Sequence, residues 1–343
     1  MINLGIIGFG RMGMIHADII KKIKDLNLIA VGEKNSDRIE EIEKKYNVKV
    51  YTDNDKLLDI EELDYVIIST TNEMHEELTI KALKKGKNVI VEKPMGLNYE
   101  STQRMVRTAE KFKKNLFVYQ SQRWDMDFLL VRDTIKTGRL GKILTIQSKV
   151  TFYGDYWAGW GIDGLNNPWR IKAKYGGGTL FDWGPHLVDQ MLQIMSKNPI
   201  GIYGILQSGL WSTEVDDSFF AIIRFDDDII YQIEVNHNCR IPLPRWYVIG
   251  TKGTLKVKGN LSNIWNEVEI NYINDDDKKV IQNIKFIDYP GAGLSSGFYQ
   301  DFVKFLNGKK KELVSMYETS KVIKILDLIK KSSKENRYIE FYN

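Results

Sequence analysis

The chain has 343 residues, of which 43% are hydrophobic and 27% are charged, a size and composition typical of a globular protein with two domains. The 49 basic and 45 acidic residues are largely interleaved, so no basic face for nucleic acid is predicted. No apolar run is long enough to span a membrane, and the first one lacks the basic flank of a signal peptide. Cys239 is the only cysteine, which excludes an intrachain disulfide and a cysteine-based zinc site, and no metal site is predicted. These features predict a cytoplasmic protein without nucleic-acid or membrane partners.

The first apolar segment ends in a glycine-rich turn with the spacing of a dinucleotide-binding site. Gly8, Gly10 and Gly13 follow a predicted strand and precede an amphipathic segment. In this motif the first glycine permits a tight turn, the second lets the backbone approach a pyrophosphate, and the third allows the helix to pack on the strand. The N-terminus of the new helix attracts the phosphate charge.

The residues after the second apolar run bear on the choice of cofactor. Glu33 stands where a carboxylate accepts hydrogen bonds from the adenosine ribose, and it repels a 2′-phosphate, which favours NAD. Lys34 and Arg38 are nearby cations that suit a 2′-phosphate, so NADP remains open. We predict NAD as the cofactor, with NADP as the alternative.

Up to about residue 120, short β-rich runs alternate with helical patterns, which predicts βαβ units and a parallel sheet. Ligands bind such sheets at the carboxyl ends of the strands. Polar clusters follow three of the predicted strands, at residues 8–13, 70–72 and 92–94. The predicted strands cover residues 4–8, 28–31, 65–69, 88–92 and 116–119, with helices around 14–24, 37–46, 74–85 and 99–113.

The pattern changes after Arg123. A helix over 128–137 and a strand over 142–152 precede a loop rich in glycine and tryptophan over 153–178 and an amphipathic helix over 179–195. Strands with turn-forming breaks then run from 200 to about 288, and helices near 297–306 and 318–331 follow. The predicted fold class is α/β: a Rossmann domain over 1–122, and a second α/β domain over 123–343 with a large, mostly antiparallel open sheet. A ligand is expected in the cleft between them.

Two further motifs indicate chemistry. Lys93 ends a predicted strand, where an ammonium beside a bound cofactor orients a substrate hydroxyl and stabilises alkoxide charge; a surface Lys-Pro turn is the alternative. Asp182 and His186 are spaced i, i+4, hence on one face of the predicted helix. A carboxylate beside an imidazole fixes its tautomer and raises its basicity, which suits a general base. A pair that only orders the helix entry is the alternative.

Taken in this order, the motifs resemble the Gfo/Idh/MocA family of nicotinamide-dependent sugar and polyol oxidoreductases over essentially the whole chain. The resemblance is carried by the glycine motif, by residues 69–75, by Glu92-Lys93-Pro94, by Trp169-Arg170 and by the segment 176–189. Ser121 and Gln122 depart from an Asn-Arg-Arg segment that is common in the family. The family implies a catalytic Lys93, with Asp182 and His186 near the reacting carbinol, and an open sheet that often mediates oligomerisation, here as a homodimer or homotetramer.

The predicted sites combine these arguments. Catalytic roles are predicted for Lys93, Asp182 and His186. Predicted substrate contacts are the same three residues with Arg123, Tyr153, Trp157 and Tyr299. The predicted cofactor site comprises Gly8, Phe9, Gly10, Arg11, Met12, Gly13, Glu33, Lys34, Arg38, Ser69, Thr70, Thr71, Asn72, His75, Glu92, Lys93, Ser121, Trp169 and Arg170.

The leading functional hypothesis is an NAD(P)-dependent dehydrogenase or reductase. It transfers a hydride between the nicotinamide and a secondary alcohol of a sugar, a sugar derivative or an inositol-like cyclitol. One alternative is an NAD-dependent glycosidase or lyase that oxidises its substrate transiently, and it differs because the cofactor does not accumulate in reduced form. The other alternative is a ligand-sensing regulator without catalysis, which any steady-state turnover excludes.

Overall fold

The first third of the chain forms a parallel sheet with the strand order β3-β2-β1-β4-β5-β6. The computed structural model describes residues 1–154, 168–258, 267–285 and 296–341. The strands of this sheet are β1 (Ile2–Ile7), β2 (Leu26–Gly32), β3 (Lys49–Tyr51), β4 (Tyr65–Ile68), β5 (Asn88–Val91) and β6 (Leu116–Val118). The helices between them are α1 (Arg11–Ile20), α2 (Ile39–Tyr46), α3 (Asn54–Leu58), α4 (His75–Lys84) and α5 (Tyr99–Phe112).

The central strands of this sheet are apolar on both faces. The side chains of Val66, Ile67 and Ile68 in β4 are 0% exposed, as are those of Val89 and Ile90 in β5. Continuous apolar runs of this kind are typical of parallel strands that carry helices on both faces. The carboxyl ends of β1, β4 and β5 therefore lie side by side at one edge of the sheet, as predicted.

The second half is built on a nine-stranded sheet with the order β14-β13-β12-β11-β7-β10-β9-β8-β15. All neighbours are antiparallel except β7 and β10, which run parallel. Its strands are β7 (Ile143–Thr151), β8 (Pro199–Gln207), β9 (Ser218–Phe225), β10 (Ile230–Asn236), β11 (Trp246–Gly250), β12 (Gly253–Lys258), β13 (Glu267–Ile273), β14 (Lys279–Lys285) and β15 (Ile339–Glu340). The helices of this part are α6 (Met126–Lys136), α8 (Thr179–Asp182), α9 (Gly184–Ile194), α10 (Ser296–Leu306) and α11 (Met316–Glu335).

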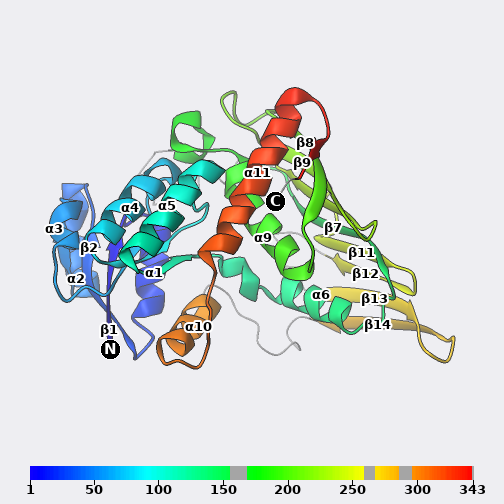
Figure 1. Ribbon diagram of the computed structural model, residues 1–343, viewed down its shortest axis with the longest axis horizontal. Helices are drawn as coiled ribbons and strands as arrows, with labels where there is room; N and C mark the ends of the chain where they lie inside the picture. The colour runs from blue at the N-terminus through cyan, green and yellow to red at the C-terminus, as the bar shows by residue number, and fades with distance from the viewer. Residues whose placement is uncertain (155–167, 259–266, 286–295, 342–343) are drawn as a thin grey trace.

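The two faces of this large sheet differ in burial. In β10, Tyr231 and Val235 are 0% exposed, whereas Gln232 and Glu234 between them are only half-buried. Figure 1 shows α6, α9 and α11 on one side of the sheet. Among the described residues, no helix covers the other side, so this alternation marks an open face, as the sequence predicted.

The helix α10 returns to the first sheet although it follows the second one in the chain. Its Phe302 packs edge-on against Tyr65 of β4 and Phe117 of β6, at ring-centroid distances of 5.0 and 6.3 Å. The helix also contacts α1 (Figure 1). A segment from the C-terminal part of the chain thus completes the hydrophobic core around the six-stranded parallel sheet.

The predicted elements agree with the structure except in a few short pieces. The five predicted strands of the first sheet are confirmed, and β3 and β15 were not predicted because such short strands carry no clear alternation. The helix predicted over 179–195 is wrong as one piece: it is divided into α8 and α9. Among the described residues, none of the helices combines the length and the apolar content needed to cross a bilayer.

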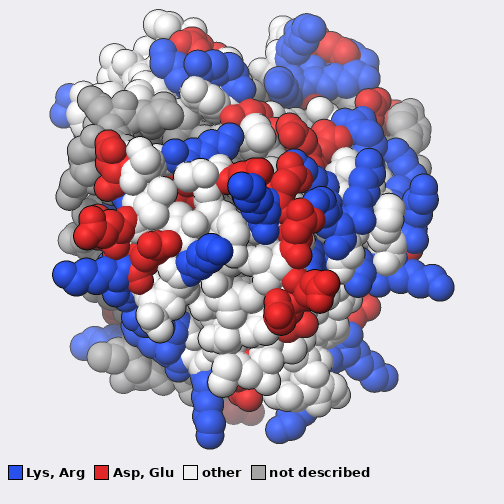
Figure 2. All heavy atoms as spheres, turned by 90° about the vertical axis from the view of Figure 1, so that its left-hand side faces the viewer, with Lys and Arg blue, Asp and Glu red and all other residues white. Residues whose placement is uncertain are grey.

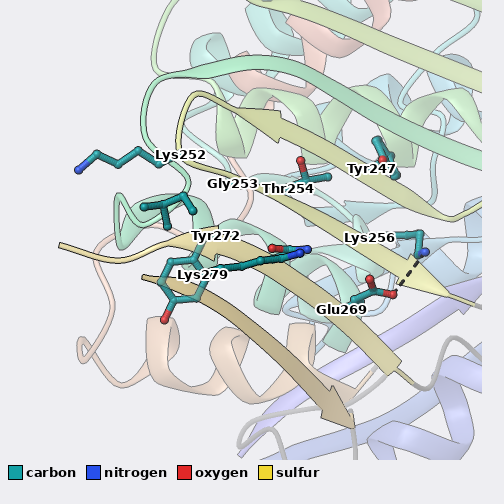
Figure 3. A pocket seen from close by; sticks show the side chains of 10 residues that line it. Tyr247, Lys252, Gly253, Thr254, Lys256, Glu269, Tyr272 and Lys279 are labelled. Carbon is teal, nitrogen blue, oxygen red and sulfur yellow. Dashed lines mark ion pairs between the residues drawn. The ribbon is translucent and has the colours of Figure 1, made fainter. Parts of the chain in front are cut away.

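Two surface features are visible away from the strand ends. Figure 2 shows basic and acidic side chains interspersed over one face. Ion pairs such as Lys81 with Asp55 at 2.6 Å occur on the surface of the protein. Figure 3 shows a hollow over β11 to β14 whose lining includes Lys252, Lys256 and Glu269. This hollow belongs to the large sheet, so it is separate from the polar strand ends of the first sheet.

Candidate active site

The glycine turn after β1 contains two packed glycines and one open glycine. Gly8 has a φ of +90°, and a Cβ atom there would lie 2.5 Å from the carbonyl oxygen of Ser69. A Cβ atom on Gly13 would lie 2.4 Å from the carbonyl oxygen of Gly8. A Cβ atom on Gly10 would meet nothing within 4 Å. The first and third glycines are therefore required by packing, whereas the second faces open space.

The open space at Gly10 lies at the start of α1 and fits a dinucleotide. Gly10 is the N-cap of α1, and no side chain caps its first turn. The unsatisfied N–H groups and the positive end of the helix dipole suit a pyrophosphate. Of the neighbours predicted to bind the cofactor, Arg11 is exposed and Met12 is half-buried, whereas Phe9 is buried against Tyr46. The side chain of Phe9 therefore belongs to the core.

The glycine turn gives a prediction that separates binding from folding. Gly10→Ala is expected to leave the melting temperature nearly unchanged, because the new methyl group meets no atom of the protein. The same methyl group occupies the pyrophosphate position, so the dissociation constant for NAD should rise roughly tenfold or more. Gly13→Ala is the matched variant and should lower the melting temperature, since its methyl group collides with the Gly8 carbonyl. Calorimetric titration with NAD checks both, and unchanged affinity in Gly10→Ala would contradict this placement of the pyrophosphate.

Glu33 lies directly after β2, where the sequence placed it. One carboxylate oxygen accepts the backbone N–H of Asn35 at 2.9 Å, and the other accepts a hydrogen bond from the guanidinium of Arg38. Lys34 is exposed. Arg38, which the sequence left open as a phosphate-binding cation, is therefore held by Glu33.

The polar residues after β4 mostly connect the strand ends to each other. His75 is buried, and its Nδ1 lies 2.7 Å from the carbonyl oxygen of Pro94, in the turn after Lys93. Burial lowers the pKa of His75, so the neutral ring is favoured there. Asn72 donates a hydrogen bond to the carbonyl of Gly176 at 2.8 Å and so connects the two halves of the chain. Thr70 and Thr71 also bond locally, whereas the buried Ser69 hydroxyl finds no partner among the described residues.

Lys93 and Asp182 form the centre of the candidate site. The Lys93 ammonium donates to the Asp182 carbonyl at 2.7 Å and to its carboxylate at 3.0 Å, and Arg170 lies 3.6 Å from the same carboxylate oxygen. Burial by itself raises the pKa of the Asp182 carboxyl, but the two cations outweigh it and hold this pKa well below its usual range. The site therefore contains an ionised carboxylate that fixes an ammonium group.

The charge of Asp182 raises the pKa of His186, but the hydrogen bonds of this carboxylate do not go to the imidazole. α8 ends at Asp182 and α9 begins at Gly184, and the Asp182 carboxylate contacts Lys93 and Arg170. His186 is buried, and its Nδ1 has no partner among the described residues. Burial, together with the positive charge of Lys93, lowers the pKa of His186 well below its usual range, although Asp182 raises it. The imidazole is neutral near pH 7, as a proton acceptor must be.

Several residues predicted to bind substrate have other contacts. The Arg123 guanidinium donates to both carboxylate oxygens of Asp189, at 2.7 and 2.6 Å, and to Glu318 at 3.0 Å. Arg123 therefore connects the segment after β6 to α9 and α11. Tyr299 is fully buried, with its hydroxyl 2.7 Å from His16. Among the described residues, neither side chain hydrogen-bonds to the Lys93 ammonium, which bonds to Asp182.

The other predicted residues have local contacts or lie outside the described part. Tyr153 is 40% exposed, with its ring edge against Trp211 and the Arg240 guanidinium over its face. The Arg170 guanidinium lies 4.3 Å from the ring centroid of Trp169. Ser121 begins the short 3₁₀ helix Ser121–Trp124, and Trp157 lies outside the described residues. Among the described residues, no cluster of His, Cys, Asp and Glu is arranged to hold a metal ion.

Sequence reasoning missed two buried groups near the site. Burial lowers the pKa of His237 to about 4, and the charges of Asp182 and Asp217 act in the opposite direction. Arg245, 1% exposed, donates to Gln190 of α9 at 2.8 Å and to Ser148 of β7 at 2.7 Å. Neither residue belongs to a motif, and only the tertiary structure brings His237 near Asp182 and Arg245 to α9.

The structure has a Rossmann-like parallel sheet and a second, mostly antiparallel sheet, and a charged pair, Lys93 with Asp182, joins the two parts. Residues 2–120 match an oxidoreductase family described as having an NAD-binding Rossmann fold, and residues 128–256 match the Gfo/Idh/MocA C-terminal domain. The chain belongs to the Gfo/Idh/MocA oxidoreductase family.

Individual relatives are similar to this chain at modest identity. A crystal structure of an NAD-binding protein from Listeria innocua is 30% identical, covers 99% of this chain and 96% of that one, and superposes with a TM-score of 0.85. Myo-inositol 2-dehydrogenase of Thermotoga maritima is 34% identical over 43% of this chain and 45% of its own length. D-glucoside 3-dehydrogenase of Escherichia coli is 28% identical over 68% of this chain and 70% of its own length. The chain spans about half the length of several curated relatives that it matches.

Proposed function

We propose that this chain is a cytoplasmic, NAD-dependent oxidoreductase acting on a secondary alcohol of a sugar, a sugar derivative or a cyclitol. The observation that carries the proposal is the Lys93 ammonium, held by Asp182 at the end of β5, with a neutral His186 on the adjoining helix. Relatives named as inositol and glucoside dehydrogenases support the substrate class. NAD bound at the glycine turn supplies the hydride acceptor.

The residues of the chain divide the remaining work. The Lys93 ammonium donates a hydrogen bond to the substrate oxygen and stabilises the negative charge that develops there. Asp182 fixes the position of that ammonium, and Arg170 lies beside the same carboxylate. The His186 imidazole accepts the hydroxyl proton during oxidation and returns it during reduction. Holding the alcohol between these groups provides the orientation on which much of the rate depends.

A panel of sugars and cyclitols tests the proposal directly. The absorbance of the reduced nicotinamide should increase in the presence of NAD and at least one member of the panel. Release of a hydrolysis or elimination product without accumulation of reduced cofactor would instead support transient oxidation. Cofactor binding without any turnover across sugars, sugar derivatives and cyclitols would contradict an enzymatic role for this site.

The position of Glu33 leads to a prediction about cofactor preference. The wild-type protein should bind NAD more tightly than NADP, because the Glu33 carboxylate repels a 2′-phosphate. Glu33→Ser removes this repulsion and releases Arg38, which the carboxylate holds. The ratio of the two dissociation constants should therefore shift toward NADP by about tenfold or more. Parallel titrations with NAD and NADP measure it, with Glu40→Ser as an exposed control, and tighter NADP binding by the wild type would contradict the preference.

We also propose that the open face of the large sheet joins two copies of the chain, as the family resemblance implies. Half-buried side chains such as Gln232 and Glu234 line this face, and Glu269 pairs with Lys256 at 3.3 Å and with Lys258 at 3.2 Å on neighbouring strands. Sedimentation equilibrium should give at least twice the monomer mass of 39.8 kDa. Gln232→Arg, which adds a charge to this face on each copy, should shift the protein toward monomer.

A further inference from the structure

A chain of buried hydrogen bonds runs from α10 to the backbone of the catalytic lysine. His16 of α1 is 0% exposed, and its Nδ1 lies 2.7 Å from the Tyr299 hydroxyl. The Nε2 of the same ring lies 2.9 Å from one carboxylate oxygen of Glu92. The other carboxylate oxygen accepts the backbone N–H of Lys93 at 3.0 Å. Tyr299, His16, Glu92 and Lys93 are thus linked without a gap.

The chemistry of the groups determines which atom donates and which accepts in each of these hydrogen bonds. A carboxylate only accepts hydrogen bonds, so the Nε2–H of His16 donates to Glu92, and Nδ1 is left to accept. Burial, together with the neighbouring Tyr119 and Glu92, raises the pKa of the Tyr299 hydroxyl well above its usual range. This hydroxyl keeps its proton and donates to Nδ1. Every donor in the chain therefore has an acceptor, and such fully satisfied buried networks are rigid.

Lys93 is consequently held at both of its ends. Its peptide N–H is fixed by Glu92, and its ammonium is fixed by the carbonyl and the carboxylate of Asp182. The side chain spans from the end of β5 in the first sheet to α8 in the second domain. Because a displacement of about 1 Å in a reacting group costs up to about a hundredfold in rate, the anchor at the peptide N–H bears on the reaction itself.

We propose that Glu92, His16 and Tyr299 are positioning residues that set the place of the Lys93 ammonium through its backbone. This inference rests on the proposed function of Lys93. Glu92, assigned by the sequence to the cofactor, and Tyr299, assigned to the substrate, act instead behind the lysine. These hydrogen bonds connect three elements: α1, which begins at the glycine turn, the end of β5, and α10.

Two substitutions interrupt the chain with little change in shape. In Glu92→Gln an amide N–H₂ replaces one acceptor. If it faces Lys93, the Lys93 N–H loses its acceptor; if it faces His16, the ring must change tautomer, and its Nδ1–H then meets the Tyr299 hydroxyl, which no longer donates to it. Tyr299→Phe removes the donor to Nδ1 at the far end. Tyr65→Phe is the matched control, because Tyr65 is also buried and also packs on α10, while its hydroxyl bonds to Asn115 instead.

The expected loss of kcat is larger for the residue that bonds to Lys93 than for the residue at the far end of the hydrogen-bond network. Glu92→Gln should lower kcat about tenfold and Tyr299→Phe about threefold, with the dissociation constant for NAD and the substrate KM changing less than about twofold. Tyr65→Phe should leave kcat unchanged. Equal losses in Tyr65→Phe and Tyr299→Phe would overturn the proposal, since the effect would then come from packing of α10 alone.

A double-mutant cycle tests whether Glu92 acts through the lysine. On a Lys93→Ala background, Glu92→Gln should cause no further loss of kcat, because no ammonium remains to be positioned. The same tenfold loss on both backgrounds would show a structural effect that is independent of Lys93, and would overturn the proposal.

A measurement without turnover keeps this inference separate from the proposed function. Lys93 can be labelled with an amine-reactive reagent in the wild-type protein and in the Glu92→Gln variant. Peptide mass spectrometry then measures the labelling rate of Lys93 in each protein. The side chain of Lys93 is 18% exposed while it is paired with Asp182, so loosening its backbone should increase its labelling rate at least about threefold. If no sugar or cyclitol is oxidised, the proposed function fails, and labelling alone then decides: an unchanged rate overturns the positioning role, and an increased rate supports it.

Discussion

Lys93→Ala is expected to lower kcat at least about a hundredfold while the dissociation constant for NAD stays nearly unchanged, since one donor to a developing oxyanion typically contributes on that scale. The structural reason is the place of the ammonium, 3.0 Å from the Asp182 carboxylate and on the side chain that follows the end of β5. The predicted pyrophosphate contacts lie at the glycine turn instead, so binding of the cofactor does not depend on this side chain. Steady-state kinetics and calorimetric titration measure the two quantities.

A second lysine variant controls for general loss of charge. Lys81→Ala removes an ammonium that pairs with Asp55 at 2.6 Å on the same domain, away from the strand ends. Its kcat should equal that of the wild type. Because Lys93→Ala also leaves the Asp182 carboxylate partly uncompensated, both melting temperatures should be recorded. Near-wild-type turnover of a folded Lys93→Ala protein would make Lys93 a structural residue.

His186→Ala is expected to lower kcat/KM about a hundredfold to ten-thousandfold and to remove the acidic limb of its pH profile. An imidazole that accepts the substrate proton works only when neutral, so activity falls as the pH decreases through its pKa. Burial and Lys93 lower this pKa well below 6.5. The wild-type limb should therefore lie below pH 6.5, with a plateau above it, in contrast to the raised basicity that the sequence predicted.

Two further variants should move this limb in opposite directions. Asp182→Asn removes a negative charge that raises the pKa of His186, so the limb should shift to lower pH. Lys93→Ala removes a positive charge that lowers the same pKa, so the limb of the residual activity should shift to higher pH. Because the chain has only four histidines, NMR titration of the ring protons can follow His186 directly, with His186→Ala identifying its resonance. If the acidic limb lies at the same pH in all variants, His186 is not the group that accepts the substrate proton.

The parts of this protein that follow local rules could be predicted from the sequence. A glycine turn between a strand and a helix is recognisable because its geometry demands glycine at Gly8 and Gly13, where a Cβ atom would meet backbone oxygens. Apolar runs such as Val66–Ile68 indicate buried parallel strands because both of their faces need apolar cover. Lys93 was predicted as a catalytic residue from its place after such a strand. Each of these inferences needs only a short stretch of chain and a known period.

The tertiary structure decided which side chain each charged group meets. The spacing of Asp182 and His186 predicted a pair, but the carboxylate accepts its hydrogen bond from Lys93, which is distant in the sequence. Glu92 and Tyr299 were assigned to ligands, yet both bond to His16. The bond of Tyr299 exists because α10 packs back onto the first sheet. The sequence by itself determined the fold class and the strand ends at which polar residues gather, since periodicity and turn geometry are local. The partners, and with them the direction of each pKa shift, depend on burial and on contacts between distant segments, which only the packed chain defines.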